Sequence, residues 1–67
     1  MNKKDFDRIT SLIDALVRRE KMYCSEYVAL NPEDRRDREA KRDLKIATYY
    51  EVQRVLASAF KKDSNDM

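Results

Sequence analysis

Leu30-Asn31-Pro32-Glu33-Asp34 is the stretch that decides the fold, because the pattern of one helix ends there and that of another begins. Asn31 is a favourable N-cap, and Pro32 suits the first position of a helix, where the N–H that proline lacks has no partner in any case. Glu33 and Asp34 place negative charge at the positive end of the new helix dipole. The stretch therefore predicts two helices joined by a tight turn at residues 31–32.

The residues before this turn carry one long apolar stripe, which predicts a helix over about residues 4–30 with Asn2 or Asp5 as its N-cap. A 3-4 spacing selects eight positions, all but one of them apolar or aromatic: Phe6, Ile9, Ile13, Leu16, Glu20, Tyr23, Tyr27 and Leu30. Three further apolar residues widen the stripe on one side: Val17, Cys24 and Val28. That breadth suits packing among three or four helices better than a two-stranded coiled-coil seam.

The residues after the turn predict a second helix, about residues 32–61, with two halves of different character. Residues 33–43 contain Ala40 as their only apolar residue and alternate in charge, which indicates a solvated helical segment. From Leu44 onward, apolar residues spread over an arc of roughly 160°, at 100° per residue, which is wider than one partner helix covers. We therefore expect this half to meet two other helices. Residues 63–67 are expected to form a flexible tail.

Folding the chain about the turn predicts an apolar end and a polar end. In this alignment Phe6 lies near Leu56 at the open end and Tyr27 lies near Arg35 at the turn. Four cations continue the core face of the second helix toward the turn at 3-4-3 spacing: Arg35, Arg38, Arg42 and Lys45. In one interpretation their stems lie over Tyr23 and Tyr27 while their charges pair with carboxylates or face solvent. In the other, these six residues form a surface that binds an acidic protein or a nucleic-acid backbone.

Glu20 is the exception within the first stripe. We interpret it as a carboxylate that pairs with an arginine across the hairpin or leans into water, in preference to a buried acid or a ligand for a cation. Neither a second acid nor a histidine stands at a matching spacing.

A chain of 67 residues buries a modest core, so an additional source of stability is expected. A disulfide within the chain is excluded because Cys24 is the only cysteine, and a zinc site is not expected without histidine. Self-association or a partner remains. We predict an all-α antiparallel two-helix hairpin that dimerises into a four-helix bundle of coiled-coil type. The expected oligomer core is Ile9, Ile13, Leu16, Tyr49, Val52, Leu56 and Phe60.

The composition argues against catalysis. The chain has neither glycine nor histidine, so phosphate-binding loops and the usual general base are missing, and no cofactor or metal is expected. Cys24 is expected to pack as a small apolar residue. A net charge of +2 is close to balance, which argues against a dedicated binder of polyanions but leaves room for a local patch. No run of about 20 apolar residues would span a membrane, and the expected location is cytoplasmic.

The predicted function is therefore that of a small protein-protein interaction module: an adaptor, regulator or inhibitor that acts through helical surfaces. One alternative is a nucleic-acid-binding regulator that uses the basic stripe in a dimeric bundle, and another is a structural subunit of a larger assembly. In length and overall plan the predicted dimer is similar to the plasmid copy-number proteins of the Rop type, paired helical hairpins that bind RNA. This similarity implies no functional residues.

Overall fold

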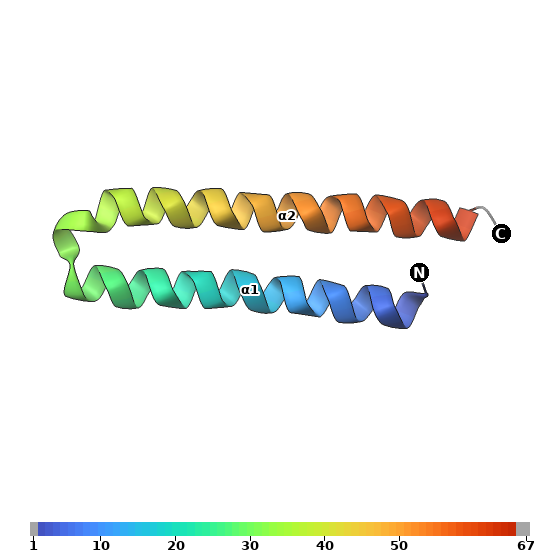
Figure 1. Ribbon diagram of the computed structural model, residues 1–67, viewed down its shortest axis with the longest axis horizontal. Helices are drawn as coiled ribbons and strands as arrows, with labels where there is room; N and C mark the ends of the chain where they lie inside the picture. The colour runs from blue at the N-terminus through green and yellow to red at the C-terminus, as the bar shows by residue number, and fades with distance from the viewer. Residues whose placement is uncertain (1, 66–67) are drawn as a thin grey trace.

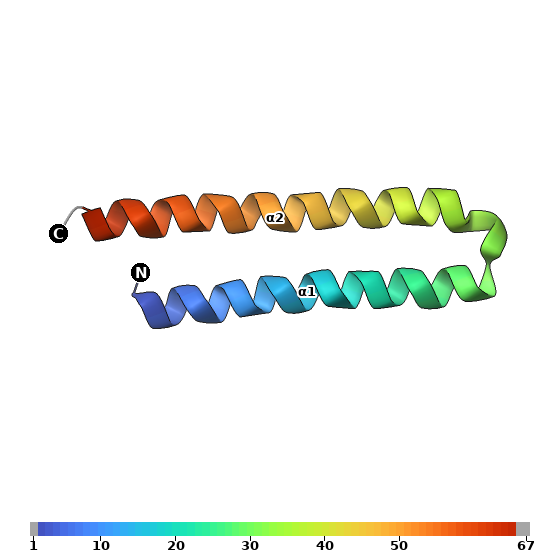
Figure 2. The ribbon, with the colours of Figure 1, turned by 180° about the vertical axis from the view of Figure 1, so that it is seen from behind.

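The chain folds as a helical hairpin. The computed structural model, which describes residues 2–65, contains α1 (Lys3–Leu30) and α2 (Arg35–Asn65), joined by the short 3-10 helix η1 (Pro32–Asp34). The two α-helices lie antiparallel and side by side, so that the start of α1 lies next to the last turns of α2 (Figures 1 and 2). The predicted all-α antiparallel hairpin is confirmed.

Two asparagines account for the ends of α1. The side chain of Asn2 accepts a hydrogen bond from the backbone N–H of Asp5 at 2.8 Å, so Asn2 is the N-cap. At the other end, the backbone N–H and the side-chain Nδ2 of Asn31 both donate to the carbonyl of Tyr27, at 2.8 and 3.1 Å. These bonds satisfy a carbonyl that the end of the helix leaves without a partner.

Asn31 therefore differs from its prediction. It does precede a proline in the first turn of η1, but within the described residues its side chain makes no capping hydrogen bond to η1. The expected N-cap of the second helix acts instead as a cap on the C-terminus of the first, because its amide group is turned back toward the carbonyl of Tyr27.

The connection between the helices is longer than the sequence predicted, and the register shifts by about one helical turn. The α-helical part of the second segment begins at Arg35, after η1, and not at residue 32. Consequently the Phe6 ring stacks on Phe60, with centroids 4.5 Å apart and an interplanar angle of 13°, and the predicted alignment with Leu56 is wrong. Residue i of α1 therefore lies level with a residue near 66−i of α2.

The end of α2 also extends beyond its prediction. The helix continues to Asn65, so residues 63–65, which were expected in a flexible tail, are helical. Residues 66 and 67 lie outside the described part of the chain.

The core is a thin seam between the two helices. Among the described side chains, the buried ones are Ile13, Val17, Glu20 and Cys24, all of them on α1. They continue into the half-buried Phe6 and Val28 at a 3-4 spacing. Their half-buried counterparts on α2 are Arg42, Ile46, Tyr49, Gln53, Leu56 and Phe60.

The seam is rotated relative to the predicted stripe. The 3-4 spacing placed Leu16 and Tyr23 in the core, but these residues are 40% and 42% exposed. Their neighbours Val17 and Cys24 are buried in the seam instead. A large part of the apolar stripe of α1 thus points to one side of the hairpin. In the range 2–65, neither helix combines the length and apolar character needed to cross a membrane.

Candidate interaction surface

One long face of the hairpin carries most of the exposed large apolar side chains. Counted at 100° per residue, the exposed apolar residues of α1 lie about a quarter turn around the helix axis from the buried residues of the seam. Those of α2 lie about a quarter turn from its seam residues, in the same rotational sense along the chain. Because the helices are antiparallel, these equal rotations bring both stripes to the same face of the hairpin. We call it the apolar face: Ile9, Leu12, Leu16, Tyr23, Tyr27, Leu30, Val52 and Val55.

The apolar face has two halves. Near the open end, Leu12 and Leu16 of α1 lie level with Val52 and Val55 of α2, and Leu12 and Val55 are 60% and 63% exposed. Near the turn, the α1 stripe continues with Tyr23, Tyr27 and Leu30. On this face of α2 the residues that lie level with these tyrosines are polar and include Lys41 and Lys45. The open half is therefore apolar on both helices, whereas the turn half is aromatic on α1 and cationic on α2.

Glu20 lies in the seam beneath the turn half and pairs with two cations of α2. Its Oε1 lies 3.6 Å from Nη2 of Arg38 and 3.5 Å from Nζ of Lys45. The Glu20 side chain is 10% exposed, and in the described part of the chain this oxygen makes no conventional hydrogen bond. The geometry matches the interpretation of Glu20 as a carboxylate that pairs with an arginine across the hairpin, but the side chain is buried, so the preference for this pairing over a buried acid is wrong on burial.

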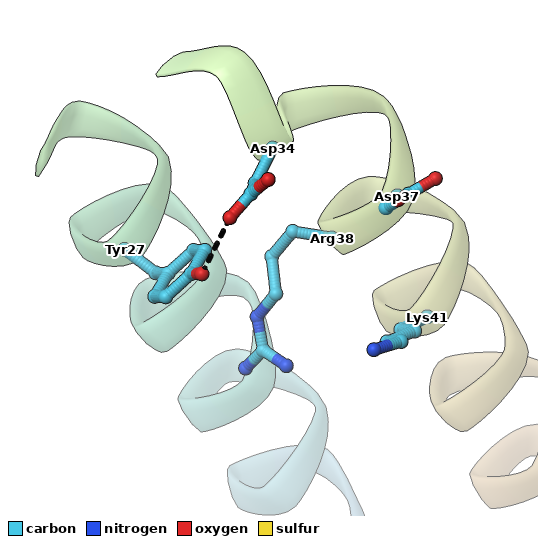
Figure 3. A pocket seen from close by; sticks show the side chains of 5 residues that line it. All are labelled: Tyr27, Asp34, Asp37, Arg38 and Lys41. Atoms are coloured by element: carbon cyan, nitrogen blue, oxygen red, sulfur yellow. Dashed lines mark hydrogen bonds between the residues drawn. The ribbon is translucent and has the colours of Figure 1, made fainter. Parts of the chain in front are cut away.

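Tyr27 is the centre of a polar cluster at the turn. Its hydroxyl donates to Oδ2 of Asp34 at 2.8 Å, and the guanidinium of Arg38 lies 5.6 Å from its ring centroid. Figure 3 shows these side chains around a shallow hollow that Asp37 and Lys41 also line. One turn back on α1, Arg19 Nε donates to the hydroxyl of Tyr23 at 3.0 Å, and its guanidinium lies 5.3 Å from that ring centroid.

Each cation of the predicted basic stripe lies near a carboxylate of the same chain. Arg35 lies 3.2 Å from Glu39, and Arg42 lies 3.0 Å from Asp43, while Arg38 and Lys45 share Glu20. Every cation of the stripe thus has a carboxylate within salt-bridge distance.

The structure divides the six candidate partner-binding residues into two groups. Tyr23, Tyr27, Arg38 and Lys45 gather at the turn half of the apolar face. Arg42 lies in the seam, and Arg35 lines a hollow with Glu39 and Asp43 on the other side of α2.

The residues predicted for the oligomer core are divided in a similar way. Four of them lie in the seam between α1 and α2: Ile13, Tyr49, Leu56 and Phe60. The other three belong to the apolar face, on which Leu16 and Val52 are exposed and Ile9 is half-buried. The expected oligomer core did not include Leu12 and Val55, although both are more exposed than Leu16 and Val52. The 3-4 spacing of Ile9, Leu12 and Leu16 indicates a row of apolar residues on α1 next to the row that forms the seam.

The hydrogen bond between Tyr27 and Asp34 predicts a pH dependence. It raises the pKa of Tyr27, because the carboxylate accepts a hydrogen bond from the phenol O–H and would repel a phenolate, whereas Arg38 acts in the opposite direction. The stabilisation from the protonated phenol is present below the pKa of an unfolded tyrosine, about 10, and is lost as the pH rises through the higher pKa of the folded state. Asp34→Asn should therefore lower the pKa of Tyr27.

A tyrosinate absorbance titration measures this effect. In Asp34→Asn, one of the four tyrosines should ionise at lower pH than in the wild type. Asp37→Asn is the control, because Asp37 lines the same hollow and the described hydrogen bond of Tyr27 is to Asp34. Superimposable curves for Asp34→Asn and the wild type would contradict the role of this bond.

A metal site finds no support in residues 2–65. No three histidine, cysteine, aspartate or glutamate side chains of this range are grouped to hold a metal ion, and Cys24 is a buried free thiol. Comparisons of the chain with protein-family models, curated proteins and solved structures give no match.

Proposed function

We propose that the chain is a small non-enzymatic protein-protein interaction module, an adaptor, regulator or inhibitor, which binds other helices through its apolar face. The observation that carries this proposal is the gathering of exposed apolar side chains on one face. Contiguous exposed apolar surface on a small protein is typical of interaction sites. Tyrosine and arginine, which dominate many binding interfaces, stand at the turn half of the same face.

The first partner of this face is a second copy of the chain. The seam of one hairpin buries few side chains, and a two-helix hairpin of this size needs further apolar burial for independent stability. Stacking two hairpins face to face gives a homodimeric four-helix bundle, in which the apolar faces become the common core.

Binding to nucleic acid has less support. Affinity for a phosphate backbone comes from cations that release condensed counterions, and it grows with the number of phosphates that they neutralise. The cations of the predicted basic stripe already lie next to carboxylates of the same chain. A phosphate would have to compete with these internal partners.

Light scattering at several protein concentrations, with and without a mixed-sequence RNA, tests the proposal. We expect the mass to rise from 8.0 kDa to twice that value with concentration and to be unchanged by RNA. A chain that stays at 8.0 kDa at every concentration would contradict self-association. A complex with RNA that weakens steeply with salt would favour the nucleic-acid alternative instead.

A further inference from the structure

We propose that the second copy binds in parallel, with both turns at the same end of the bundle and with α1 of each hairpin packed against α2 of the other. This inference rests on the proposed function, because it specifies how the apolar face is covered. It follows from the way the two stripes of the face match each other at each level along the hairpin.

Two symmetric arrangements can bring identical faces together. If the two-fold axis runs along the hairpin, α1 lies on the partner's α2 at the same level, and the two turns lie together. If the axis runs across the hairpin, α1 lies on the partner's α1, α2 lies on the partner's α2, and the turns are at opposite ends; we call this the crosswise arrangement. In either case a contact from residue i to residue j is repeated from j to i. The parallel arrangement therefore requires the two stripes of one copy to be complementary to each other at each level.

The open half of the face meets this requirement. Leu12 and Leu16 lie level with Val52 and Val55, so the parallel arrangement places apolar side chains against apolar side chains in both symmetric contacts. The crosswise arrangement of fully overlapping hairpins instead brings Val52 and Val55 of one α2 to the level of Lys45 and Lys41 of the other. Covering these ammonium groups with valine removes water from both charges and offers them no new partner, and of the two only Lys45 has a carboxylate, that of Glu20, within salt-bridge distance among the ion pairs of the described residues.

The turn half meets the requirement by a different kind of contact. Tyr23 and Tyr27 of α1 lie level with Lys41 and Lys45 of α2, so the parallel arrangement places the cations of one copy over the tyrosine rings of the other. The hairpin already uses this contact within one copy, because Arg38 lies over Tyr27 and Arg19 lies over Tyr23.

Charge does not oppose the meeting of the two turns. The turn half of the face and its margins carry four cations and four carboxylates: Arg19, Arg38, Lys41, Lys45, Glu20, Glu26, Asp34 and Asp37. Two such surfaces that face each other bring together balanced charge, so like-charge repulsion is small and the dimer should depend only weakly on salt.

The face is also large enough. The hairpin is 54 Å long and 17 Å wide, measured on its Cα atoms. Two faces of this size, fully overlapped, supply the roughly 1,200–2,000 Å² of total buried surface that stable interfaces use. A staggered dimer that overlaps only at the open halves would fall below this range.

Spin labels on the intact chain test the orientation. One label is placed at the turn through Glu33→Cys and, in a separate variant, one at the open end through Lys4→Cys, both in a Cys24→Ala background. Each of the two labelled positions is exposed in the hairpin. Neighbouring helices lie 8–10 Å apart, so with the label arms the parallel dimer predicts distances of about 20–35 Å between copies at both positions.

Each other outcome overturns the inference in a distinguishable way. In the crosswise dimer both labels would be about 45–60 Å apart, because each end of one hairpin 54 Å long lies at the far end of the other. In a staggered dimer the open-end label would report a short distance and the turn label a long one. If neither label gives a measurable distance between two copies, that result would contradict self-association itself, and with it the proposed function. If Cys24→Ala does not fold, the same labels are introduced with Cys24 retained, since this thiol is 1% exposed and protected from the reagent.

Discussion

Replacing Val17 with aspartate should unfold the hairpin. Val17 is 4% exposed and lies in the middle of the seam, so a carboxylate at this position would lose most of its water. The variant forfeits about 1.5–3 kcal/mol of valine burial and adds a desolvation cost of several kcal/mol for the charge. Their sum is comparable to the whole stability of a small domain, about 5 kcal/mol. We expect most of the helical circular dichroism signal to disappear at room temperature.

Ala15→Asp is the matched control, because it introduces the same charge two residues away on an exposed position that faces away from the seam. Its cost is limited to helix propensity, at most about 0.7 kcal/mol, and its helical signal should persist. Equal stability of the two variants would mean that the seam does not pass through Val17. The seam would then pass through Leu16, as the 3-4 spacing of the sequence predicted.

Replacing both Leu12 and Val55 with aspartate should abolish self-association and leave the hairpin folded. The two side chains are more than half exposed in a single copy, so charge at these positions is compatible with the seam between α1 and α2. In the dimer each substitution occurs twice and would bury four carboxylates among apolar side chains. We expect the dissociation constant to rise by more than about 100-fold, which corresponds to about 2.7 kcal/mol.

Tyr50→Asp is the matched control for this second prediction. Tyr50 is 44% exposed, close to the value for Val52, but it lies on the opposite face of the hairpin with Asp14, Arg18 and Lys21. A charge there is away from the apolar face, so Tyr50→Asp should associate like the wild type. If Tyr50→Asp dissociates and the double variant does not, the interface lies on the other face.

Local patterns in the sequence predicted the hairpin, and longer-range packing determined the rest. The bounds of α1 follow from Asn2, from Asn31-Pro32 and from the apolar periodicity, all of which act over one or two helical turns, whereas both bounds of α2 differ from those predicted. The rotation of the seam is different. The apolar stripe of α1 is wide enough to contain two parallel rows, one through Leu16 and one through Val17, and only contact with α2 selects between them.

The error in the predicted register of the hairpin also came from a feature that the sequence pattern does not show. Counting from a turn at Asn31-Pro32 aligned Phe6 with Leu56, but the three residues of η1 lengthen the connection and bring Phe60 to Phe6. A 3-10 turn in place of the first turn of an α-helix is decided by local energies too small to be read from residue preferences. The misalignment by one turn follows from it.

The candidate surface was predictable in kind and not in detail. Spacing alone brought Tyr23, Tyr27, Arg38 and Lys45 to the turn end. The pairing of the basic stripe with carboxylates depends on which rotamers the long side chains adopt: Glu39 lies 3.2 Å from Arg35 and 3.8 Å from Arg42, and Glu20 lies near two cations on the other helix. The spacing of residues along the chain does not predict which of several carboxylates a given cation contacts.

Sedimentation equilibrium of the wild type, of the Leu12→Asp/Val55→Asp double variant and of Tyr50→Asp, each at several concentrations, tests most directly whether the apolar face is an interface. The wild type and Tyr50→Asp should reach twice the monomer mass of 8.0 kDa, and the double variant should remain at the monomer mass while keeping its helical signal. A wild type that stays monomeric throughout, or a double variant that dimerises as the wild type does, would contradict the assignment of the apolar face as the binding surface.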